Sequence, residues 1–308
     1  MKLGLGIPQR KGVDLRNDII EAARTAESAG FSSLWTHERL VFPTEPRDGM
    51  YGVPGLPWGK YYEQSPDSLA MLAAAAAVTE TVRLGTSVLV APLYQPVRLA
   101  KALATIDQIS GGRLVAGLGV GWSSDEARAV GGSMSERGRR VDETLDVFQA
   151  VWGPDPVSYE GDTVVLDKAI VLPKPVSRIP VLIGGGSTRA LDRIARRADG
   201  WTPSGLSPAQ VGETWSQIRE TAAGYGRDPA AMELIVRANI QVTGDPAGDN
   251  RFPFTGNMGQ IIDDIVACAQ VGADELIVEL QLVEPFAGTK HLLDTALEIR
   301  ERAVAAGI

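Results

Sequence analysis

The stretch QISGGRLVAGLGVGW, residues 108–122, contains the junction that decides the fold. Ser110-Gly111-Gly112 is typical of the end of a helix, because glycine readily adopts the left-handed conformation that closes one. Arg113–Leu118 follows at once, and a short, mostly apolar run of this kind is typical of a buried strand. A helix that returns to a buried strand within three residues is the repeating step of a parallel α/β fold.

The same step recurs along the 308 residues of the chain. Strand-like runs occur at residues 3–7, 33–37, 82–90, 113–118, 180–183, 200–202, 234–242 and 275–280, and helical patterns at 15–29, 66–79, 95–109, 135–152, 188–198, 208–225, 258–271 and 289–305. Eight such βα units predict an α/β fold with a single (β/α)8 TIM barrel over residues 1–308. An inserted β-hairpin is expected at 157–172, after the fourth helix. A doubly wound sheet, the alternative, needs fewer strands or a second domain, and no linker is evident.

Composition narrows the class of protein. Hydrophobic residues make up 44% and charged residues 22%, which indicates a folded globular chain. The net charge of −8 argues against a nucleic-acid or acidic-membrane partner. The single cysteine, Cys268, and two histidines, His37 and His291, argue against disulfides and against a cysteine or histidine metal site, so we expect a cytoplasmic protein without a metal. No apolar run reaches the ~18 residues of a membrane span.

The predicted loops are unequal in length. Those that follow strands are long, at 43–65, 119–134 and 243–257, whereas those that follow helices are short. In a barrel the long set lies at the C-terminal face, where active sites form. Loop 43–65 carries Tyr51, Trp58, Tyr61 and Tyr62, which suits an aromatic lid over a flat ligand. Packing of these rings against neighbouring loops is an equally open interpretation.

A glycine-rich turn joins the predicted strand 180–183 to the next helix. Gly184, Gly185 and Gly186 allow close approach to the backbone, and Ser187 and Thr188 open a helix whose N-terminus attracts anions. The turn lacks the lysine of a P-loop and the last glycine of a dinucleotide fingerprint. It indicates a phosphate site, with a tight turn and helix cap as the alternative.

Two further strand ends carry candidate site residues. Gly117–Gly121 leaves room for a flat ring, with Trp122 and Asp125 at the rim, although close strand packing explains the glycines as well. His37, Glu38 and Arg39 end the second strand and suit acid–base or anion-binding roles, with a surface Glu38–Arg39 ion pair as the alternative.

Several stretches resemble the luciferase-like monooxygenases, most specifically residues 108–122. The others are residues 26–35, 83–92, 137–143 and 198–201. Glu38-Arg39-Leu40 and residues 51–58 are most similar to actinobacterial members that use the deazaflavin coenzyme F420. The resemblance implies the (β/α)8 barrel, with F420 or FMN at its C-terminal mouth.

The resemblance also implies roles for particular residues. It places a cis peptide at Ser87-Val88 behind the cofactor ring and the cofactor phosphate on Gly184–Thr188. It assigns the polar positions after the second and fourth strands to Glu38 and Asp125. Many members have Asp-His where this chain has Glu38-Arg39, so a histidine-based proton transfer is not simply carried over. Strand alternation predicts that His37 and Glu38 point to opposite faces.

The function expected is hydride transfer between F420 and a small organic substrate. The catalytic candidates are His37, Glu38, Arg39 and Trp122, and the cofactor-binding candidates are Ser87, Val88, Asp125 and Gly184–Thr188. The first alternative is an FMN-dependent monooxygenase supplied by a flavin reductase, and the second is a barrel that binds flavin or another ligand without turnover. The resemblance allows a homodimer. Arg10, Lys11, Arg39, Arg47 and Lys60 are the cations expected to attract the anionic tail of F420.

Overall fold

A closed ring of parallel strands forms the centre of the molecule, in a computed structural model that describes residues 1–308. Hydrogen bonding runs in the order β3-β2-β1-β13-β10-β9-β8-β5-β4, and β3 also pairs with β5, which closes the ring. β3 and β4 both pair with β5 and count as one interrupted strand, so the barrel has eight strands. Their bounds are β1 Lys2–Gly6, β2 Ser33–Thr36, β3 Arg83–Thr86, β4 Leu89–Val90, β5 Leu114–Gly119, β8 Val181–Ile183, β9 Gly200–Trp201, β10 Glu233–Asn239 and β13 Glu275–Glu279.

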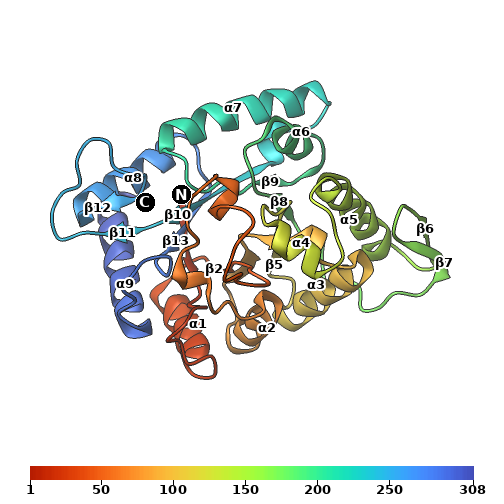
Figure 1. Ribbon diagram of the computed structural model, residues 1–308, viewed down its shortest axis with the longest axis horizontal. Helices are drawn as coiled ribbons and strands as arrows, with labels where there is room; N and C mark the ends of the chain where they lie inside the picture. The colour runs from red at the N-terminus through yellow and green to blue at the C-terminus, as the bar shows by residue number, and fades with distance from the viewer.

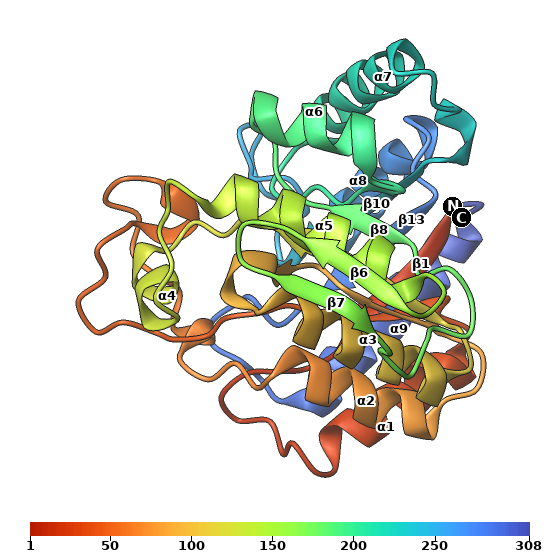
Figure 2. The same ribbon diagram turned by 90° about the vertical axis from the view of Figure 1, so that its right-hand side faces the viewer.

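Helices surround the strands (Figure 1). They are α1 Asp18–Ala29, α2 Ser68–Val78, α3 Pro96–Ser110, α4 Ser124–Ala129, α5 Arg137–Trp152, α6 Thr188–Arg197, α7 Pro208–Gly224, α8 Met258–Gln270 and α9 Thr289–Ala305. Both chain ends lie at one end of the barrel, and α4 projects at the other (Figure 2). No helix is long and apolar enough to cross a membrane. The closed ring of eight parallel strands and the surrounding helices confirm the predicted TIM barrel.

The structure differs from the expected elements in three places. The predicted strand 82–90 is divided, because the Ser87-Val88 peptide is cis and lies between β3 and β4. The predicted loop 119–134 contains α4, capped by Ser123, whose hydroxyl accepts from the Glu126 amide. The predicted strand 234–242 ends at Asn239, and Gln241–Val242 (β11) pairs instead with Thr255–Gly256 (β12).

The predicted hairpin is present outside the barrel. Val157–Glu160 (β6) and Val165–Ala169 (β7) pair in antiparallel fashion and lie over the flank of the helical layer (Figure 2). The pair is separate from the barrel sheet, and β6 packs against α5.

Two apolar cores hold the fold together. The larger has 60 buried residues between strands and helices, and the smaller fills the barrel interior with Trp35, Val115, Leu182, Ile235 and Ile277. Gly85 makes room for the indole of Trp35, since a Cβ at Gly85 would lie 2.3 Å from that ring. Because side chains alternate along a strand, residues two positions beyond these fill the next layer toward the C-terminal mouth.

Candidate active site

An aromatic lid covers the C-terminal mouth. Trp58, from the loop between β2 and α2, packs against Trp122, which follows β5, with ring centroids 4.5 Å apart. Tyr62 meets Trp58 edge-on at 6.5 Å and His37 at 5.7 Å. The hydroxyls of Tyr51 and Tyr62 are 3.0 Å apart. The predicted position of the lid over the mouth is thus confirmed, and the lid rings also pack on neighbouring loops.

Arg39 fixes the lid from below. Its Nη1 lies 2.9 Å from Oε2 of Glu126 in α4, and both side chains are nearly buried. Its guanidinium lies 4.7 Å from the ring centroid of Trp122, the geometry of a cation–π contact. The alternative Glu38–Arg39 ion pair does not form, since Arg39 pairs with Glu126, a residue that the sequence reasoning missed.

Glu38 contacts β4 and the segment that follows it. Its carboxylate accepts from the Val90 amide at 2.5 Å and contacts the Tyr94 hydroxyl. Burial raises the pKa of Glu38 to about 7, although the hydrogen bonds from Tyr94 and Val90 oppose the rise. Glu38 therefore joins the end of β2 to the β4 segment, and its catalytic role remains a prediction.

His37 lies on the opposite side of the chain, as alternation predicts. Its Nδ1 is 3.6 Å from Oε2 of Glu279 at the end of β13, and both side chains are buried. Arg237 in β10 places Nη2 3.4 Å from the same oxygen and donates from Nη1 to the Ser87 carbonyl at 2.7 Å. Three strands and the β3–β4 connection thus meet around one carboxylate.

Buried polar atoms of His37 and of two residues in β10 lack a hydrogen-bond partner. They are both ring nitrogens of His37, Nε and Nη2 of Arg237, and Oδ1 of Asn239. Buried polar groups are rarely left unpaired, so each needs an explanation. A polar ligand at the mouth supplies one, because it would satisfy donors and acceptors that the protein leaves open.

Small residues surround Val88 on the adjacent strands. A Cβ at Gly119 would lie 2.6 Å from Cγ2 of Val88, and one at Gly184 would lie 3.2 Å from Cγ1. The Ser87 hydroxyl is 3.2 Å from that of Thr202. The structure therefore brings Ser87, Val88 and the first residue of the glycine turn together.

The glycine turn itself connects β8 to α6. Gly185 has φ of +112°, Ser187 caps α6 by accepting from the Ala190 amide, and the Trp201 indole donates to the Gly185 carbonyl at 2.9 Å. Residues 185–189 are exposed. An exposed glycine turn at the N-terminus of a ten-residue helix fits an anionic phosphate.

Asp125 lies at the start of α4 and contacts the lid loop. Its Oδ1 lies 2.9 Å from Nε of Arg47, and its Oδ2 accepts a hydrogen bond from the Arg47 amide at 2.9 Å. Nearby, the Asp48 carboxylate accepts from the Ser124 amide at 2.7 Å. In this structure Asp125 thus ties the lid to α4, and its role toward a cofactor remains a prediction.

The prediction of the cations that would attract an F420 tail is partly wrong. Arg10 is 4% exposed and donates to the carbonyls of Gln281 and Val283, each at 2.6 Å, while its Nη2 pairs with Glu284. Arg39 is likewise committed to Glu126. Both guanidiniums satisfy internal acceptors. The other three, Lys11, Arg47 and Lys60, are exposed, but Arg47 pairs with Asp125 at 2.9 Å and Lys11 lies 3.5 Å from Glu63.

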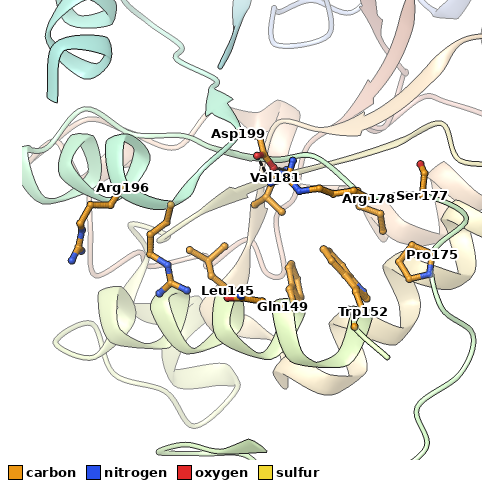
Figure 3. Close-up of a pocket in the computed structure, with 13 residues that line it drawn as sticks. Leu145, Gln149, Trp152, Pro175, Ser177, Arg178, Val181, Arg196 and Asp199 are labelled. Carbon is orange, nitrogen blue, oxygen red and sulfur yellow. Dashed lines mark hydrogen bonds and ion pairs between the residues drawn. The ribbon is translucent and has the colours of Figure 1, made fainter. Parts of the chain in front are cut away.

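A separate cavity of about 660 Å³ lies elsewhere. It is lined by the C-terminal half of α5 and by residues that precede β8 and β9. Figure 3 shows Leu145, Gln149 and Trp152 directed from one helix toward Val181 and Arg178. The cavity lies by the N-terminal ends of these strands and is therefore separate from the mouth. Its arginines are already paired with aspartates.

Sequence reasoning missed Glu279, Arg237 and Asn239. Each lies in a strand that looks apolar overall, and only the inward alternation along β10 and β13 gives a signal. Counting in steps of two from Ile235 and Ile277 leads to Arg237 and Glu279, which are polar residues in the expected mouth layer.

Comparison with known proteins identifies the family. The model of the luciferase-like monooxygenase family matches residues 2–248. The chain belongs to the luciferase-like monooxygenase family. An uncharacterised protein of Mycobacterium tuberculosis is 35% identical over 225 residues, which cover 70% of this chain and 78% of that one.

Two relatives carry names that specify a cofactor. An F420-dependent glucose-6-phosphate dehydrogenase of Nakamurella multipartita is 31% identical over 74% of this chain and 65% of its own length. An FMNH2-dependent dimethylsulfone monooxygenase of Pseudomonas fluorescens is 30% identical over 78% of this chain and 65% of its own. Both kinds of cofactor therefore occur among the relatives.

The fold is shared with solved structures. The monooxygenase RslO1 of Streptomyces bottropensis superposes with a TM-score of 0.76 at 24% identity, covering 97% of this chain and 98% of that one. This likeness supports the luciferase-like barrel.

Proposed function

We propose that the protein is an oxidoreductase that transfers a hydride between coenzyme F420 and a small organic substrate at the C-terminal mouth. The observation that carries the proposal is His37, a buried acid–base group whose two ring nitrogens have no hydrogen-bond partner within the protein. Hydride transfer to or from a carbon that bears oxygen also moves a proton, and a positioned histidine suits that transfer.

The chemistry of the site fits such a cofactor. Gly184–Thr188 would hold the phosphate that F420 and FMN share, and Ser87 and Val88 would lie behind the ring. When bound, F420 supplies a two-electron hydride carrier, and the protein contributes orientation and electrostatics. The lid formed by Trp58 and Tyr62 would exclude water, which strengthens electrostatic interactions within the site.

The surroundings of His37 favour its neutral form, which can act as a base. Burial lowers the pKa of His37, as does the positive charge of Arg237, while contact with Glu279 opposes the shift. His37 is therefore neutral near pH 7, so one ring nitrogen is free to accept a proton.

The second candidate is an FMN-dependent monooxygenase fed by a separate flavin reductase. Its support is the similarity to the FMNH2-dependent relative over 78% of the chain. The same glycine turn would serve its phosphate.

An anaerobic turnover assay separates the two candidates. The protein is incubated without oxygen with oxidised F420 and a panel of secondary alcohols, and in parallel with reduced F420 and the matching ketones. Oxygen-independent change in F420 absorbance supports the proposal. Turnover that requires both reduced FMN and molecular oxygen would establish the second candidate instead.

A further inference from the structure

Three charged or titratable side chains form a buried network beneath the lid. His37 follows β2, Arg237 lies in β10 and Glu279 ends β13. Oε2 of Glu279 is 3.6 Å from Nδ1 of His37 and 3.4 Å from Nη2 of Arg237. Both contacts are longer than a direct hydrogen bond, so a modest closure, on the order of 0.5 Å, would form two charge-assisted bonds to one oxygen.

A glycine on the adjacent strand makes room for this carboxylate, because β1 pairs directly with β13. A Cβ at Gly6 in β1 would lie 2.9 Å from both carboxylate oxygens of Glu279. The other oxygen, Oε1, accepts from the Gln281 amide at 3.3 Å. The carboxylate is therefore confined between β1 and its own chain, and it faces His37 and Arg237.

The network has a defined charge distribution. Burial disfavours an ionised Glu279, but its contact with His37 and the charge of Arg237 outweigh burial and lower the pKa of Glu279. The positive charge of Arg39 also lowers the pKa of His37, and Tyr62 of the lid packs against the imidazole. One arginine therefore neutralises one carboxylate, and His37 stays neutral beside them.

We propose that Glu279 is a positioning residue that holds His37 as the Nδ1–H tautomer, so that Nε2 takes the hydroxyl proton of an alcohol substrate. This inference rests on the proposed function, since it names the substrate class of that site. A carboxylate that accepts from Nδ1 fixes both the tautomer and the ring orientation of a histidine. Arg237 balances the charge and ties the network to the Ser87 carbonyl.

The step balances as an alcohol oxidation. The hydroxyl proton would move to Nε2 of His37, the carbinol C–H bond would break, and the hydrogen would leave with the electron pair of that bond, as a hydride, to an oxidised deazaflavin. The C–O bond becomes a carbonyl, so the alcohol is oxidised and the deazaflavin is reduced. In the opposite direction, the protonated imidazole returns the proton to the oxygen.

The tautomer can be measured on the protein without cofactor. The chain has only two histidines, so ¹⁵N-histidine NMR gives two rings, and His291→Gln assigns them. We expect wild-type His37 to carry its proton on Nδ1 at pH 7. Glu279→Leu should remove that preference, whereas Glu298→Leu, on a surface helix, should leave it intact.

A His37 that carries its proton on Nε2 in the wild type, or a tautomer unchanged in Glu279→Leu, would overturn the proposal. Gly6→Ala provides a second variant in case Glu279→Leu does not fold. This variant keeps the Glu279 carboxylate but displaces it, so we expect the preference of His37 for a proton on Nδ1 to weaken.

The kinetic readout addresses positioning directly. Glu279→Gln removes the charge that favours imidazolium, so the acid limb of the kcat pH profile should move to lower pH. We expect kcat to fall about 10–100-fold in Glu279→Leu with KM little changed. An unshifted acid limb together with unchanged kcat would contradict the proposal. If His37 carries its proton on Nδ1 but the protein does not turn over F420, the proposed function is wrong. The positioning role of Glu279 would then still stand.

Discussion

Nδ1 of His37 lies 3.6 Å from Oε2 of Glu279, although the two residues are separated by almost the whole length of the barrel sequence. The closure of the barrel brings them together, because β1 pairs with both β2 and β13. A histidine near the end of the second strand thereby acquires a buried carboxylate from the last strand.

Replacement of His37 tests the acid–base assignment. We expect His37→Gln to lower kcat about 100-fold, the scale of a lost general acid–base catalyst, with cofactor affinity unchanged. His291→Gln is the matched control, because that histidine lies on the exposed start of α9. Equal kcat in His37→Gln and the wild type would remove His37 from the mechanism.

Glu38 should make stability depend on pH. Its folded pKa of about 7 exceeds the ordinary value of 4.5, so the native state keeps a proton that the unfolded chain releases. This contribution is fully present below pH 4.5 and is lost as pH rises through 7. We expect the free energy of unfolding to fall by about 2 kcal/mol between pH 5 and pH 8, relative to Glu38→Gln.

Urea denaturation of both proteins at the two pH values measures this difference. The comparison with Glu38→Gln cancels the titration of all other groups. Parallel stability curves for the two proteins would show that Glu38 is ionised throughout.

The glycine turn offers a variant that changes charge without strain. A Cβ at Gly186 would meet no atom within 4 Å, whereas Gly185 has a positive φ that a side chain would strain. We expect Gly186→Asp to weaken cofactor binding at least 10-fold, because a carboxylate would repel the phosphate. Gly224→Asp, at an open glycine that ends α7, is the control. Fluorescence titration gives both affinities, and equal values would place the phosphate elsewhere.

Removal of the lid indole should affect the substrate more than the cofactor. Trp58→Ala removes the ring that packs on Trp122, and we expect kcat/KM to fall about 10-fold with a smaller change in cofactor affinity. Trp152→Ala, which removes an indole stacked on Phe148 outside the barrel, controls for general loss of packing. A larger loss of cofactor affinity than of turnover would assign Trp58 to the cofactor.

The sequence predicted the fold well because periodicity and glycine punctuation are local signals. The eight strands and main helices occur within a few residues of the expected positions, and the lid and glycine turn lie at the mouth. The site was only partly predictable. Pairings such as Arg39 with Glu126 depend on where α4 folds back, which no local pattern contains.

The tail-binding cations show the same limit. Arg10 and Arg39 are close in sequence to the expected mouth, but internal carbonyls and carboxylates bind their guanidiniums. Charge in a sequence therefore predicts attraction only after the internal partners are known.

Comparative titration of the wild-type protein with F420 and FMN, at low and high ionic strength, tests the central claim most directly. The remaining exposed cations at the mouth favour an anionic tail only weakly, and salt screens them. We therefore predict that F420 binds more tightly than FMN at both salt concentrations, with a narrower difference at high salt. Tighter binding of FMN under both conditions would contradict the account and favour the monooxygenase.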